Sequence, residues 1–352
     1  MKKLLLVSLV AFGALTVKAQ DKPADPPLTI TGSVDAYYKY DFSGHNNVPT
    51  SFATDQNSIS IGMVDLALKK KVGKASFVGE VSFGPRGQYQ SIPNGDGNPA
   101  NANNSYHIQN LYVSYDATDN LNLTLGYMGT FVGYEVISPV GNFNYSTSYL
   151  FTNGPFQNAG FKATYTFSPK ASLMVGAFND QWNVYKSVSR VNTLGAQLFL
   201  SPVDGWNAYI NLIYGDNETP TSGTVLDLTT SYQVTEAFKL GLNAASFRAS
   251  KGAGNGGYVG AALYPQLAVS SAVTLGLRGE YFKTKTGTYV TAGPAAGQSV
   301  TAITATANIK SGPLTFIPEF RLDNASTNAF TNSSGAATKQ ASQFLLAAVY
   351  AF

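Results

Sequence analysis

The sequence predicts an all-β fold, a transmembrane antiparallel up-and-down β-barrel of about 16 strands. Three observations predict it: an export signal at the start, alternation of apolar and polar residues along the mature chain, and connections that alternate between short and long. No mature segment is apolar enough to form a spanning helix. Without such helices, only a closed barrel satisfies every backbone hydrogen-bonding group inside lipid.

The export signal occupies residues 1–19. Lys2 and Lys3 give a basic start, residues 4–15 form an apolar run, and small residues precede the expected cleavage after Ala19. The apolar run is too short to anchor the chain in a bilayer. We therefore expect Sec-type export, cleavage near Ala19 and localisation in a bacterial outer membrane.

The composition argues against several classes of protein. The formal net charge is +3, and three positive charges, those of Lys2, Lys3 and Lys18, leave with the signal. A near-neutral mature chain lacks the basic surplus that a nucleic-acid partner requires. Only 12% of residues are charged, while Tyr and Phe occur 21 times each. The chain has no cysteine, so disulfides cannot stabilise it after export.

Alternation with a period of two residues places the strands. In the first strand, Leu28 and Ile30 lie on one face and Asp35 lies on the other. Residues 20–27 before it are expected to form a periplasmic N-terminal segment, and residues 28–352 the barrel. Each strand is near the roughly 9–11 residues that cross a membrane at a tilt. The expected strands are residues 28–41, 57–69, 74–84, 105–116, 121–133, 157–167, 171–181, 191–200, 205–215, 223–234, 237–248, 257–269, 272–284, 299–310, 313–323 and 341–352.

The connections between these strands differ in length. Short turns, such as residues 117–120 and 168–170, alternate with long polar stretches, such as residues 85–104, 135–156 and 324–340. Transmembrane barrels have tight periplasmic turns and long extracellular loops. The alternation therefore places both termini on the periplasmic side, which requires an even number of strands.

Two strands are expected to be irregular. Ile59 and Ile61 lie on one face of the second strand, whereas Val64 and Leu66 lie on the opposite face. This change of phase predicts a β-bulge, or the local end of the membrane-facing surface. Pro318 removes one ladder hydrogen bond from another strand, and we expect a bulge beside it as well.

The last strand carries a candidate assembly signal. Phe344, Leu346, Ala348, Tyr350 and Phe352 lie on one of its faces. A terminal strand that ends in an aromatic residue is similar to the assembly signal of bacterial outer-membrane barrels. We therefore expect Phe352 to engage the barrel assembly machinery. The alternative is one more strand that ends in an aromatic belt.

Most of the mature chain resembles the OmpL-like β-barrel porins of Bacteroidetes and related bacteria. The resemblance is carried by residues 66–70 (LALKK), 78–84 (VGEVSFG), 133–135 (GYE), 144–148 (NYSTS) and 179–183 (NDQWN). None of these segments is a catalytic motif, and the family's substrates are poorly defined. The resemblance implies an outer-membrane porin and adds no mechanism at the level of residues.

A barrel of this size is wide enough for an aqueous channel, whose wall should be polar. The pore-lining candidates are Asp35, Lys39, Glu80, Lys162, Asp227, Lys239, Arg278, Glu280, Glu319 and Arg321; Asp65, Asp180 and Asp323 share their face. Both signs of charge occur, which predicts weak ion selectivity. Four of the candidates, on two strands separated by one other, form a dense cluster that can define a transverse field. The alternative is that the charges only pair across the wall and keep the lumen wet.

The third long loop, residues 135–156, is the candidate constriction. In general porins this loop folds inward and narrows the pore. Here Glu135 is its only charged residue, and Asn142, Asn144, Tyr145 and Tyr149 supply amides and rings that suit sugar-like solutes. The alternative is a loop that packs on the external rim. If the loop sets the exclusion limit, deleting it should raise the conductance.

The expected function is a single-domain porin for passive diffusion of small hydrophilic solutes, with outer-membrane lipid around it. A homotrimer is expected by analogy with general porins alone. The alternatives are a solute-specific channel for sugars or anions and a surface-exposed adhesin or structural barrel. His45 and His107 are the only histidines, and no clear catalytic or metal-binding set surrounds them. We therefore expect no enzyme, no metal and no cofactor.

Overall fold

The computed structural model describes residues 25–88, 106–180, 182–187, 189–215, 222–250, 254, 256–287 and 292–352. The expected export signal, residues 1–19, lies outside the described residues. The expected periplasmic segment, residues 20–27, is described only from residue 25, and that part is exposed coil. Within the described residues, no helix is long and apolar enough to cross a membrane.

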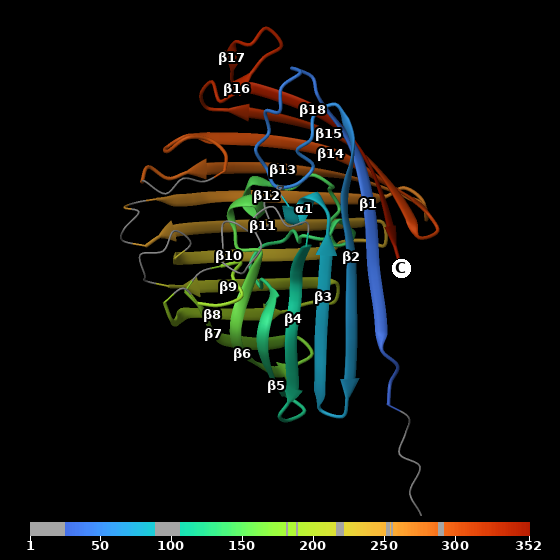
Figure 1. Ribbon diagram of the computed structural model, residues 1–352, viewed down its shortest axis with the longest axis vertical. Helices are drawn as coiled ribbons and strands as arrows, with labels where there is room; N and C mark the ends of the chain where they lie inside the picture. The colour runs from blue at the N-terminus through green and yellow to red at the C-terminus, as the bar shows by residue number, and fades with distance from the viewer. Residues whose placement is uncertain are drawn as a thin grey trace, which may run out of the picture.

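Sixteen antiparallel strands of the described chain close into one barrel, as the sequence predicts (Figure 1). They are β1 Thr29–Asp41, β2 Ser58–Val72, β3 Ala75–Phe83, β4 Tyr106–Asp116, β5 Leu121–Gly129, β6 Gln157–Ser168, β7 Ala171–Asn179, β8 Val191–Leu200, β9 Trp206–Tyr214, β10 Gly223–Gln233, β11 Phe238–Ala249, β12 Gly257–Ala268, β13 Val273–Thr284, β14 Ser299–Ser311, β15 Leu314–Ala325 and β18 Gln340–Ala351. Each strand pairs with its neighbours in sequence, and β18 pairs with both β15 and β1 to close the sheet. A small hairpin, β16 Phe330–Thr331 and β17 Ala337–Thr338, lies in the connection before β18.

The two faces of the barrel follow the alternation. In β1, Asp35 and Lys39 are buried on the inside, whereas Val34 is 49% exposed on the outside. In β13, Arg278 is buried and Leu277 is 48% exposed. Apolar side chains therefore cover the outer surface, where lipid replaces water, and polar side chains point inward.

The two ends of the barrel differ. At one end the strands meet in tight turns, such as the one at Gly73 between β2 and β3 and the one at Gly312 between β14 and β15. Both glycines have positive φ, 57° and 60°, which a tight hairpin turn favours and most other residues resist. Both ends of the barrel chain lie at this end (Figure 1). By the pattern of transmembrane barrels it is the periplasmic end, and the long loops face outward.

The bulge expected in the second strand is present. Val34 pairs with Val64 but Ala36 pairs with Ile61, so Gly62 and Met63 stand opposite a single residue of β1. The extra residue turns Met63 inward and leaves Ile61 and Val64 both exposed to lipid. The change of phase in the sequence is therefore the means by which the apolar surface continues across the bulge.

The bulge expected beside Pro318 is wrong. On the β14 side, Phe316 pairs with Ile309 and Glu319 pairs with Thr306, and the register is the same before and after the proline. The ladder omits the two pairs in between and then resumes. The physical reason is that losing the proline's donor interrupts the hydrogen bonding locally without requiring an inserted residue.

Candidate functional site

The loop that follows β5 enters the barrel and does not lie on its rim. It contains two short helices, η2 Pro139–Gly141 and α2 Tyr149–Asn153. Tyr145 and Tyr149 on this loop are each only 1% exposed, and their hydroxyls reach carboxylates of distant strands, Asp35 and Asp323. The structure thus favours insertion of the loop into the lumen over packing on the external rim, the two placements that the sequence left open.

The first contact that fixes the loop is made by Glu280 on β13. Its two carboxylate oxygens accept hydrogen bonds from the backbone amides of Tyr149 (3.0 Å) and Leu150 (2.9 Å). These amides belong to the first turn of α2, where they have no partner within the helix. The hydroxyl of Ser148 caps the same turn by accepting from the amide of Phe151 at 3.0 Å. The barrel wall therefore holds the start of α2 directly.

A second wall carboxylate, Glu319 on β15, holds the segment before α2. It accepts from the backbone amides of Tyr145 (3.1 Å) and Ser146 (3.3 Å). The hydroxyl of Thr306 donates to the same carboxylate at 3.0 Å, and the side-chain amide of Asn144 donates to that hydroxyl at 2.7 Å. Glu319 is 2% exposed, so these bonds replace the water that its charge would otherwise need.

Arg278 on β13 pairs with a carboxylate of the loop itself. Its guanidinium donates to Glu135 at 2.8 Å and to the carbonyl of Ser146 at 2.6 Å. Glu135 also accepts from the amide of Ser148 at 2.7 Å and from the hydroxyl of Tyr264 at 3.2 Å. Arg278 is 0% exposed, and the pair therefore joins loop and wall in a site without solvent.

Arg321 on β15 completes the attachment. It donates to both oxygens of Asp323, at 2.7 and 3.0 Å, and to the carbonyl of Thr147 at 2.9 Å. Its charge lies 5.1 Å from the centre of the Tyr149 ring, and the Tyr149 hydroxyl donates to Asp323 at 2.7 Å. Burial, and then the charge of Asp323, raise the pKa of Tyr149 well above its ordinary value, so the phenol keeps the proton that it donates.

The opposite side of the loop rests on β1 at the bulge. The Tyr145 hydroxyl donates to Asp35, and the Met63 amide in the bulge donates to the same carboxylate at 3.1 Å. Arg86, in the short helix α1 Pro85–Gln88, lies 3.8 Å from Asp35 and donates to the carbonyl of Ile137 in the loop at 3.2 Å. The loop is thus tied to both sides of the barrel.

The remaining pore-lining candidates lie outside this network. Lys39 is buried and donates to Asn46 (2.5 Å) and to the carbonyl of Thr54. Asp227 accepts from the amide of Gly133, at the start of the inserted segment, and from two asparagine side chains on neighbouring strands. Glu80, Lys162 and Lys239 are half-buried on the inner face. The role of each candidate in conduction stays a prediction.

The dense cluster of Arg278, Glu280, Glu319 and Arg321 differs from its expected arrangement. The sequence predicts opposite charges that face an open lumen. In the structure all four are at most 2% exposed, because the loop covers them and supplies their partners. They bind the loop to the wall, and other residues face the open space.

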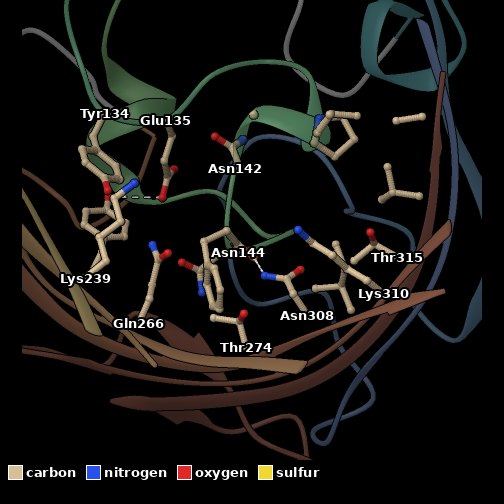
Figure 2. A pocket seen from close by; sticks show the side chains of 18 of the residues that line it. Tyr134, Glu135, Asn142, Asn144, Lys239, Gln266, Thr274, Asn308, Lys310 and Thr315 are labelled. Carbon is tan, nitrogen blue, oxygen red and sulfur yellow. Dashed lines mark hydrogen bonds between the residues drawn. The ribbon is translucent and has the colours of Figure 1, made fainter. Parts of the chain in front are cut away.

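That open space is a cavity of about 710 Å³ on the turn side of the loop. Figure 2 shows Lys239, Gln266 and Asn308 rising from the strands toward the loop, with Asn142 on the loop side. Lys310, Thr274 and Thr315 line it as well, together with Glu135, Asn144 and Tyr134. Amides and hydroxyls dominate the wall. The charged groups are two lysines and Glu135, whose charge Arg278 already balances.

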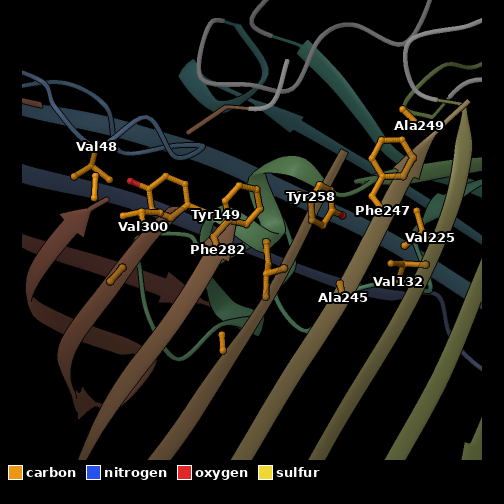
Figure 3. Packing of buried hydrophobic residues seen from close by; sticks show 14 of the residues in the cluster. Val48, Val132, Tyr149, Val225, Ala245, Phe247, Ala249, Tyr258, Phe282 and Val300 are labelled. Carbon is orange, nitrogen blue, oxygen red and sulfur yellow. The ribbon is translucent and has the colours of Figure 1, made fainter. Parts of the chain in front are cut away.

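On the other side of the loop, aromatic rings fill part of the interior. Tyr149, Phe282, Tyr258 and Phe247 form a row across the strands, with successive ring centres 5.4–5.7 Å apart (Figure 3). All four are almost completely buried. The row packs α2 against the wall on the side of the long loops. Glu280 holds the start of the same helix by hydrogen bonds.

Sequence reasoning missed several residues of this site. Lys310 and Asn308 continue the inward face of β14 that begins with Thr304 and Thr306, so alternation alone could have found them. Arg86 lies in a stretch without alternation. No local signal in the sequence links it to Asp35.

Comparisons with known proteins agree with this architecture. A family model described as "putative beta-barrel porin-2, OmpL-like" matches residues 27–352. No curated protein matches the chain. The outer membrane channel DcaP of Acinetobacter baumannii is similar, with 14% identity, a TM-score of 0.63, and coverage of 94% of this chain and 99% of that one.

Two further solved structures are similar. An anion-selective porin from Comamonas acidovorans has 13% identity and a TM-score of 0.62, with 93% of this chain and 99% of that one covered. OmpT of Vibrio cholerae, in a trimer form, has 12% identity and a TM-score of 0.56, with the same coverage. At these identities the likeness shows a shared fold and nothing finer.

Proposed function

This chain belongs to the OmpL-like β-barrel porins of the outer membrane, and we propose that it lets small hydrophilic solutes diffuse passively through its lumen. The observation that carries the proposal is the cavity beside the inserted loop. Its wall offers amides, hydroxyls and two lysines, which can replace part of a solute's hydration shell without binding it tightly. The outer wall of the same strands is apolar.

Liposome swelling with sugars of graded size tests this function. Vesicles that contain the purified protein should swell at rates that fall with sugar size, because the loop leaves a limited cross-section. Vesicles with heat-denatured protein provide the control. A folded barrel that admits neither sugars nor ions would support the adhesin or structural alternative and contradict the proposal.

A preference for anions is a second property that the cavity supports. The wall carboxylates Glu280 and Glu319 are occupied by loop amides, and Glu135 is paired, so the charges left facing the cavity are those of Lys239 and Lys310. One structural neighbour is described as an anion-selective porin. Glu280 and Glu319 do not line this cavity, and the positive charge of Arg278 offsets that of Glu135.

Replacing both lysines, K239Q/K310Q, should move the zero-current potential in a KCl gradient toward cation preference. The control K70Q/K74Q removes the same charge from the turn end of β2 and β3, away from the cavity. An unchanged potential in K239Q/K310Q would show that these lysines do not set the selectivity.

We further propose how the protein is exported, assembled and associated. Cleavage of the export signal near Ala19, assembly of the barrel through its C-terminal Phe352 and association into a homotrimer each fit an exported barrel with this fold. Phe352 exchanges two backbone hydrogen bonds with Gly32 of β1, at 2.9 and 3.0 Å, and its ring is 58% exposed. One neighbour is described in a trimer form. Segments such as residues 66–70 support an origin in Bacteroidetes-type bacteria.

The same proposal makes the chain a channel and not an enzyme. His107 is 0% exposed, and its ring lies 3.3 Å from the side-chain amide of Gln157. His45 is exposed in the loop after β1. The two therefore lie in separate surroundings, and neither faces the cavity that a solute would enter.

A further inference from the structure

Three cations gather on the outer surface near the loop end of β11, β12 and β13. Arg248 lies one residue from the end of β11, Lys283 one residue from the end of β13, and Lys285 just beyond it. Arg248 pairs with Gly257, and the amide of Lys285 donates to the carbonyl of the same glycine at 2.9 Å. The backbones of Arg248 and Lys285 therefore lie on one rung of the sheet, about 10 Å apart. Gly257 lies between them and carries no side chain.

The alternation of the strands shows that these side chains point away from the lumen. Phe247 and Phe282, the residues that precede Arg248 and Lys283, are 0% exposed inside the barrel. Arg248 and Lys283 are exposed on the opposite face. They are therefore directed at whatever surrounds the barrel and not at a solute that passes through it.

Lys285 is held on the same surface by hydrogen bonds. Its ammonium donates to the hydroxyl of Ser246 at 3.1 Å and to the carbonyl of Phe247 at 2.8 Å, both on β11. To reach them it crosses β12 at Gly257, where no side chain stands in its way. The ammonium is thus fixed on the strand that carries Arg248.

The three positive charges are not balanced by the protein. Among the described residues, no carboxylate forms an ion pair with any of them. Burial and the nearby charge of Arg248 lower the pKa of Lys285 from its ordinary value. Like charges so placed repel one another, and an anion bound between them would remove that repulsion.

The surface below the cations is apolar. Leu226, Val259, Leu263 and Tyr281, on β10, β12 and β13, are 40–57% exposed on the same outer face. The cations therefore stand at the boundary between the apolar belt and the loop end, which is the level of the lipid headgroups. A ligand that covers both regions has an anionic head and acyl chains.

We propose that Arg248, Lys283 and Lys285 bind a phosphate group of a phosphorylated glycolipid in the outer leaflet of the membrane. The ammonium of Lys285 lies over β11 beside Arg248, and Lys283 stands two residues before Lys285 on the side of the apolar belt, so one phosphate can meet all three cations. The acyl chains of the glycolipid lie along the apolar belt. Guanidinium and ammonium groups bind phosphate oxygens by charge-assisted hydrogen bonds.

Native mass spectrometry of the detergent-purified barrel tests the site. The probe is a bisphosphorylated, acylated glucosamine disaccharide, and the comparison is the same glycolipid without its phosphates. The wild-type barrel should retain the phosphorylated form about tenfold better. The variant R248Q/K283Q/K285Q should lose this preference, and R248Q alone should lose part of it.

The control K69Q/K70Q/K74Q removes three cations from the opposite end of the barrel and should keep the wild-type preference. A heat-dependent shift in gel mobility checks that every variant is folded. Equal retention of both glycolipids by the wild type would overturn the proposal. So would an unchanged preference in R248Q/K283Q/K285Q, or an equal loss in the control.

Discussion

Replacing residues 141–152 with a short Gly-Ser linker should raise the single-channel conductance at least about twofold, because a barrel of this size encloses a wide lumen once nothing fills it. The deleted segment contains most of α2 and the buried rings of Tyr145 and Tyr149. Its removal opens the space between β1 and β13, and water then solvates the charged wall groups. Planar bilayer recordings measure the effect directly.

The matched control shortens a different connection at the same end of the barrel. The tip of the connection that carries β16 and β17 is exposed beyond the barrel strands (Figure 1), so removing residues 333–336 should leave the conductance unchanged. Liposome swelling should show the same contrast, with larger sugars admitted only by the first deletion. A conductance that stays at the wild-type value after removal of residues 141–152 would falsify the idea that this loop limits passage.

Arg278→Met should release the loop without unfolding the barrel. The substitution leaves Glu135 buried without its positive partner, and breaking such a pair costs about 3–5 kcal/mol. The barrel is held by a closed ladder, whereas the loop depends on side-chain contacts, so the loop is the part that yields. Chymotrypsin, which cuts after the aromatic residues of the loop, should then cleave it about ten times faster or more. Bilayer recordings should show added current fluctuations.

Lys162→Met is the matched control for that experiment. Lys162 is also an inward-facing cation on a strand, but it forms no ion pair with any described residue. Its removal should change neither the rate of cleavage nor the current noise. If Arg278→Met left the loop as resistant as in the wild type, the ion pair with Glu135 would not be what holds the loop in place.

The positions of the strands follow from the sequence because a membrane barrel imposes a period of two residues on every strand. Residues 57–69 are expected as a strand and Ser58–Val72 is observed; residues 313–323 are expected and Leu314–Ala325 is observed. In β2 the change in the phase of the apolar residues predicts either a bulge or a local end of the membrane-facing surface, and the bulge is observed. The bulge predicted beside Pro318 was wrong because a proline in a strand indicates a missing hydrogen-bond donor. It does not indicate whether a residue is also inserted.

The contents of the lumen could not be predicted in the same way. Alternation says which side chains point inward but not what they meet there. Arg278 and Glu135 are 143 residues apart in the chain, and their pairing depends on the closure of the whole sheet. Burial of Arg278 and Glu280 beneath the loop is therefore a property of the assembled barrel, although each residue is correctly placed on the inner face by local pattern.

The wall carboxylates grip the loop by its main chain. Glu280 and Glu319 accept hydrogen bonds from four backbone amides of the loop, and backbone amides are present whatever side chain a residue carries. The attachment is thus largely indifferent to the identity of the loop residues that border the passage, such as Asn142. Substitution there can alter which solutes pass while the hydrogen bonds that hold the loop stay intact. One barrel can therefore be adapted to new solutes by exchanging a few side chains.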